Sequence, residues 1–101
     1  MTPLELTCSR HMDGLLPSAF ALEQYLAFHP ELSGEEFQSS ARMADFCRRE
    51  GMETEYPFAG LPTAFRAAAV RTSHPKGKLC ILCEYDALPI GHGCGHCATE
   101  R

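Results

Sequence analysis

The chain has 101 residues, a formal net charge of −4 and an apolar fraction of 45%. This length supports one small domain with a modest core, and the apolar fraction excludes a disordered chain. The nine lysines and arginines are scattered, which argues against nucleic acid as a partner. No apolar run approaches the ~20 residues that span a bilayer. The start of the chain shows no basic segment followed by an apolar one, so we expect a cytoplasmic protein without a membrane partner.

Two helices are predicted in the first half of the chain. Residues 1–13 lack a clear period and are expected to form a loose start, with the folded unit over 14–101. Apolar residues at helical spacing predict a first helix over about 14–28 and place Pro17 in its first turn.

The second helix has clear start and stop signals. Ser33 and Glu36 have the spacing of a capping box, and Gly51 is a good stop signal. The apolar positions expected on one face of this helix are Phe37, Ala41, Ala44 and Cys47.

Strands are predicted in the second half of the chain. Short strands are expected at 52–56 and 63–70, and the unbroken apolar run in 78–85 predicts a strand buried on both faces. The order of two helices, then strands, is that of an α/β domain. Its site is expected at the carboxyl end of a central strand, where ligands bind in open α/β sheets.

A glycine-rich loop at 91–96 carries the residues of a transition-metal site. Cys94 and His96 are separated by one glycine, and thiolate and neutral imidazole are ligands that zinc prefers. His92 is a further candidate, either as a third ligand or as a donor to a ligand. Asp86 precedes the loop, where its carboxylate could hold a ligand imidazole in the required tautomer.

A four-cysteine zinc site is the rival interpretation. Cys80 and Cys83 form one Cys-x2-Cys pair, and Cys94 and Cys97 form another. The first pair lies in the predicted strand, where residues three apart face opposite sides. This geometry argues against a four-cysteine site. The paired spacing still allows one, and the chain would then be a structural zinc module without catalysis.

Four motifs follow one another along the chain: His-Pro-Glu-Leu-Ser-Gly-Glu-Glu at 29–36, Leu-Pro-Thr-Ala-Phe-Arg-Ala at 61–67, Glu-Tyr-Asp-Ala-Leu-Pro at 84–89 and Gly-His-Gly-Cys-Gly-His at 91–96. Their order resembles that of the aminoacylase-like amidohydrolases and metallopeptidases. The second and third motifs look closest to the β-alanyl-lysine dipeptidase branch of that family. The resemblance covers about residues 20–96.

The resemblance implies a zinc- or manganese-dependent hydrolase of N-acyl amino acids or dipeptides. Cys94 and His96 match metal ligands of a two-metal site, and Asp86 matches the acid that supports it. Residues 14–101 would then be the N-terminal part of a zinc-peptidase-like catalytic α/β domain, with two helices followed by strands of a mixed sheet. The general-base glutamate, further ligands and the dimerisation domain of the homo-oligomeric family would lie beyond residue 101. The chain alone is therefore expected to be inactive.

Overall fold

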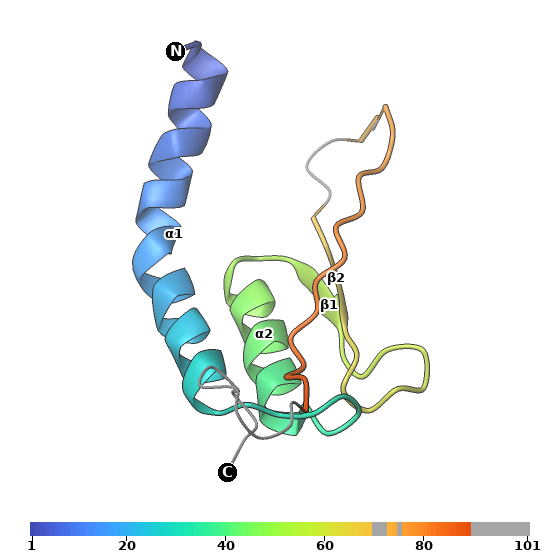
Figure 1. Cartoon of the computed structure of the whole chain (residues 1–101). Helices are drawn as coiled ribbons and strands as arrows, with labels where there is room; N and C mark the ends of the chain where they lie inside the picture. Colours follow the sequence, from blue (N-terminus) through green and yellow to red (C-terminus); the bar gives the residue numbers. More distant parts are fainter. Residues whose placement is uncertain (70–72, 75, 90–101) are drawn as a thin grey trace.

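The computed structural model describes residues 1–69, 73–74 and 76–89. In this part of the chain the helices and strands are α1 (Pro3–Phe28), α2 (Phe37–Arg49), β1 (Glu53–Glu55) and β2 (Arg66–Ala68). Two helices followed by a two-stranded antiparallel sheet make a small α/β unit, as predicted (Figure 1).

Helix α1 begins at Pro3, so the prediction of a loose start over 1–13 is wrong. Thr2 and Glu5 form a capping box: the Thr2 hydroxyl accepts from the Glu5 amide at 3.1 Å, and the Glu5 carboxylate accepts from the Thr2 amide at 3.0 Å. Proline at the first helical position reinforces this start. Pro17 consequently lies inside the helix and not in its first turn. The Thr-x-x-Glu signal that starts this helix was present in the sequence.

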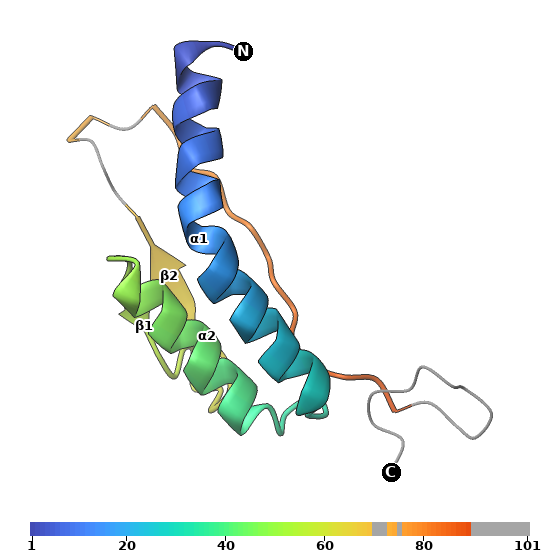
Figure 2. The same cartoon turned by 90° about the vertical axis from the view of Figure 1, so that its left-hand side faces the viewer.

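Only the second half of α1 lies beside α2 (Figures 1 and 2). There the Arg42 guanidinium of α2 stacks over the Tyr25 ring, 3.6 Å from its centroid. The Tyr25 ring also stacks on His29, whose Nδ1 lies 2.8 Å from the Tyr25 carbonyl oxygen. These contacts fix the end of α1 and therefore the start of the loop that follows it. Neither α1, despite its 26 residues, nor α2 is both long and apolar enough to cross a membrane.

Helix α2 begins at Phe37, and the predicted Ser33–Glu36 capping box does not form. Glu36 occupies the N-cap position without a side-chain capping bond. Glu31 caps the helix in its place, because its carboxylate accepts from the amides of Gln38 at 3.2 Å and Ser39 at 2.6 Å. A turn at 32–35, closed by a hydrogen bond from the Glu35 amide to the Leu32 carbonyl, brings Glu31 over the helix end.

The buried face of α2 is built from small residues. Ser39, Ser40 and Ala44 are buried, whereas Phe37 is 55% exposed, so the predicted apolar face is only partly correct. The Ser40 hydroxyl donates to the Phe37 carbonyl and lies 2.8 Å from the Tyr56 hydroxyl. Because the Ser40 and Tyr56 hydroxyls have hydrogen-bond partners, α2 can pack against the sheet without burying an unpaired polar group there.

The predicted strands at 52–56 and 63–70 are confirmed in shorter form. β1 and β2 pair antiparallel, with Glu53 opposite Ala68 and Glu55 opposite Arg66. An exposed ion pair of 3.2 Å joins Glu55 and Arg66 across the ladder. α2 contacts both strands.

The predicted buried strand at 78–85 is absent from the described structure. Residues 78–85 have no strand assignment, and their apolar side chains are exposed: Leu79 is 88%, Ile81 75% and Leu82 91% exposed. An extended apolar segment becomes a central strand only where neighbouring strands accept its backbone groups. Within the described residues no strand pairs with 78–85.

Candidate functional site

Three of the four sequence motifs meet beside the N-terminal end of α2. Leu32 and Ala87 form a parallel β-bridge, and the Ala87 amide donates to the Glu31 carbonyl at 2.7 Å. Residues 84–89 are therefore docked on the loop at 29–36. We call this meeting of segments 29–36, 61–67 and 84–89 the motif junction.

Tyr85 provides the second attachment within the motif junction. Its hydroxyl donates to the Thr63 carbonyl, and its ring stacks on Phe65 with centroids 6.1 Å apart. Thr63 is only 9% exposed, and its hydroxyl donates to the Glu36 carboxylate at 3.3 Å. Segment 61–67 is thus connected both to the docked segment and to the residue that precedes α2.

The protonation states of Glu31 and Tyr85 favour the hydrogen bonds that these side chains form in the motif junction. Burial by itself raises the pKa of the Glu31 carboxyl, but hydrogen bonds from Ser39 and Gln38, helped by nearby His29, lower it overall. Burial raises the pKa of the Tyr85 hydroxyl, and Glu36 and Tyr56 add to that increase. At neutral pH Glu31 is therefore an ionised acceptor and Tyr85 a protonated donor.

Asp86 lies between the two attached residues of the docked segment. Tyr85 before it is hydrogen-bonded through its side chain, and Ala87 after it through its backbone. Asp86 itself is partly buried. A carboxylate whose backbone is fixed on both sides can present a constant acceptor to a neighbouring imidazole.

The predicted metal ligands Cys94, His96 and His92 lie outside the described residues. Among residues 1–69, 73–74 and 76–89, no group of three or more His, Cys, Asp or Glu side chains is placed to hold a metal ion. The chemistry of the predicted donor set, a thiolate with imidazoles beside an acid, fits zinc. Of the predicted site residues, Asp86 lies within the described structure.

The four-cysteine alternative remains untested. Cys80 and Cys83 are both exposed, while Cys94 and Cys97 lie outside the described residues. Burial raises the pKa of the Cys47 thiol, and Cys83, which lies near it, raises it further.

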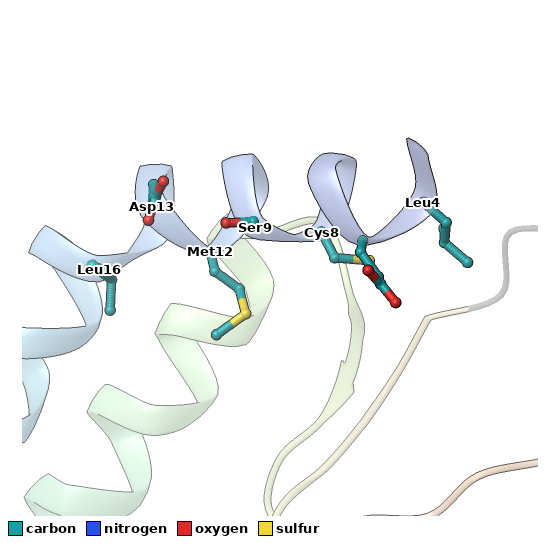
Figure 3. Close-up of a pocket in the computed structure, with 7 residues that line it drawn as sticks. Leu4, Cys8, Ser9, Met12, Asp13 and Leu16 are labelled. Carbon is teal, nitrogen blue, oxygen red and sulfur yellow. The ribbon is translucent and has the colours of Figure 1, made fainter. Parts of the chain in front are cut away.

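A groove on α1 is separate from the motif junction. Leu4, Cys8, Met12 and Leu16 recur every four residues and point to the same side of the helix, whereas Asp13 points away (Figure 3). No residue of the three motifs lines this groove. Its apolar lining is that of a helix face and not of a catalytic site.

The sequence predicts Asp86 as a candidate site residue but does not predict the residues that hold its neighbours in place. Glu31, Thr63 and Tyr85 were noted only as members of motifs. One sequence feature could have predicted them. Three motifs of the same family resemblance each carry a hydrogen-bonding group: the Glu31 carboxylate, the Thr63 hydroxyl and the Tyr85 hydroxyl.

Comparison with known proteins shows that most of the chain is similar to dipeptidases. It is 38% identical over 84 residues to the Xaa-Arg dipeptidase of Mus musculus, a match covering 75% of this chain and 20% of the relative. It is 36% identical over 104 residues to the Xaa-Arg dipeptidase of Homo sapiens, covering 92% of this chain and 24% of the relative. No family model and no solved structure matches.

These matches confirm the predicted resemblance to a dipeptidase branch of the aminoacylase-like metallopeptidases. The chain is similar to Xaa-Arg dipeptidases over most of its length. It spans 20% to 24% of the length of these relatives.

Proposed function

We propose that the chain corresponds to the N-terminal portion of a metal-dependent dipeptidase, or of a related amidohydrolase, that cleaves the amide bond of dipeptides or N-acyl amino acids. The observation that carries the proposal is the convergence of three motifs around Asp86, with Cys94 and His96 following eight and ten residues later. The similarity to Xaa-Arg dipeptidases supports the same reaction class.

In this proposal Cys94 and His96, with His92 as a third candidate, hold zinc or manganese. A metal bound there would polarise the amide carbonyl and lower the pKa of a bound water. Asp86 accepts the free N–H of a ligand imidazole, which fixes its tautomer and orientation. Since the family resemblance places the general base beyond residue 101, we propose that the 101-residue chain alone does not turn over substrate.

Zinc binding by the 101-residue chain tests this proposal. We expect Cys94→Ser combined with His96→Ala to lower zinc affinity by more than the ~10–100-fold that loss of a supporting partner costs. Competition with a chromophoric chelator measures the affinity. The matched control, Cys80→Ser combined with Cys83→Ser, removes two exposed thiols and should leave zinc binding unchanged.

The alternative function is a structural zinc module that uses Cys80, Cys83, Cys94 and Cys97. The two Cys-x2-Cys pairs and the exposure of Cys80 and Cys83 favour it. It requires the opposite result: the Cys80/Cys83 double variant would lose zinc, and a chelator would unfold the chain. That result would refute the proposed dipeptidase metal site.

A further inference from the structure

We propose that Glu31 is a positioning residue that fixes the backbone from which the Asp86 side chain extends. The inference rests on the proposed function, because it gives Asp86 the role of supporting a metal ligand. It assigns Glu31 a role that acts through the backbone of Ala87.

Glu31 joins two parts of the molecule through its two ends. Its side-chain carboxylate accepts from the Ser39 and Gln38 amides at the N-terminus of α2. Its main-chain carbonyl accepts from the Ala87 amide at 2.7 Å. The side chain therefore ties residue 31 to the helix, and the backbone of residue 31 ties the docked segment to the same helix.

The helix end is a favourable place for this carboxylate. Free amide groups and the positive end of the helix dipole both attract an anion there. The pKa of Glu31 is lowered overall, so the carboxylate is ionised at neutral pH. A charged acceptor makes stronger hydrogen bonds than a neutral one, which stiffens the attachment.

Both attachments are needed to direct Asp86. The Tyr85 hydroxyl holds the residue before Asp86 against Thr63, and this single point would leave the chain free to rotate about it. The Ala87 amide bond to Glu31 holds the residue after Asp86. With both in place, the direction in which the Asp86 side chain leaves the backbone is fixed.

Hydrogen exchange of the Ala87 amide, followed by NMR, tests the attachment without any metal. We expect Glu31→Ala to speed exchange of this amide at least about tenfold, as local opening becomes easier. Glu31→Gln keeps one side-chain oxygen able to accept from the Ser39 amide and should restore part of the protection. Glu35→Ala is the matched control, because it removes an exposed carboxylate from the same loop, and it should leave Ala87 unchanged. Unchanged exchange in Glu31→Ala would overturn the inference.

A double-mutant cycle with zinc separates positioning from general stabilisation. Glu31→Ala should weaken zinc binding about tenfold in the wild-type background. In an Asp86→Asn background it should cause no further loss, since its effect passes through Asp86. Additive losses would show that Glu31 acts independently of Asp86 and would refute the positioning role.

The same measurements distinguish the two ways of failing. If zinc affinity does not depend on Cys94 and His96, the proposed function is wrong and the positioning role falls with it. If zinc depends on them and on Asp86 but the Glu31 and Asp86 effects are additive, the proposed function stands and only the positioning role is wrong.

Discussion

The substitution Tyr85→Phe tests whether the motif junction is held by the Tyr85 hydroxyl. Phenylalanine keeps the ring that stacks on Phe65, so the change removes one O–H group and little packing. The Thr63 carbonyl loses its donor, and Thr63 is only 9% exposed, so water cannot readily replace it. Leaving a buried acceptor unpaired costs about 1–3 kcal/mol.

Tyr56→Phe is the matched comparison. It also removes a tyrosine hydroxyl, which lies 2.8 Å from the Ser40 hydroxyl. Ser40 retains its hydrogen bond to the Phe37 carbonyl at 3.2 Å and is not left unpaired. We therefore expect a smaller loss, in the range of about 0.5–1.5 kcal/mol for an ordinary hydrogen bond.

Urea denaturation followed by far-UV circular dichroism measures both losses. For a chain of this size each 1 kcal/mol also lowers the Tm by roughly 4–8 °C, which gives a second readout. A Tyr85→Phe chain as stable as wild type, or more stable than the Tyr56→Phe chain, would refute the role assigned to the Tyr85 hydroxyl.

Two further predictions concern Glu31 and Pro17. The pKa of Glu31 is lower in the folded chain than in the unfolded chain, so ionised Glu31 stabilises the fold. This stabilisation is complete above the unfolded carboxyl pKa of about 4.3, and it is lost as the pH falls through the pKa of the folded chain. Glu31→Gln should remove this part of the acid dependence in urea titrations at different pH, and an unchanged dependence would contradict the capping role. Pro17→Ala returns an amide donor to the interior of α1 and should increase stability by up to ~3 kcal/mol, with greater helicity by circular dichroism. Unchanged helicity and stability would show that Pro17 does not weaken the helix.

Local signals in the sequence predicted the order of elements but not every helix start. The region of α2 and the two short strands followed from periodicity and from stop residues such as Gly51. Ser33 was expected to cap α2, because it has the correct spacing from Glu36. The turn at 32–35 instead places the Glu31 carboxylate over the helix end, where it accepts from two amides. Glu31 lies six residues before the helix, and no local sequence pattern predicts a cap from that distance.

The segment at 78–85 shows why burial could not be predicted from the same signals. An unbroken apolar run indicates a central strand only if other strands flank it. Within the described residues no strand pairs with 78–85, and the nearest β-bridge is that of Ala87, two residues beyond it. The Tyr85 side chain contacts segment 61–67, but Leu79 and Leu82 remain exposed. The motifs at 29–36, 61–67 and 84–89, in contrast, do contact one another in the structure, through hydrogen bonds whose partners lie within this chain. In the sequence these motifs supported only the family resemblance, and their contacts were not predicted.

The start of α2 couples the stability of this unit to the direction of Asp86. Ser39 and Ser40 are buried side by side, and each serves a different neighbour: the Ser39 amide binds Glu31, and the Ser40 hydroxyl binds Tyr56 near the end of β1. A larger side chain at either position would push the helix away from the acidic loop or from the sheet, since buried positions leave no room for added volume. Any such displacement moves Glu31 and, through the Ala87 amide, the backbone on which Asp86 stands. The position of the Asp86 backbone is therefore set by how closely α2 packs and not only by the residues next to Asp86.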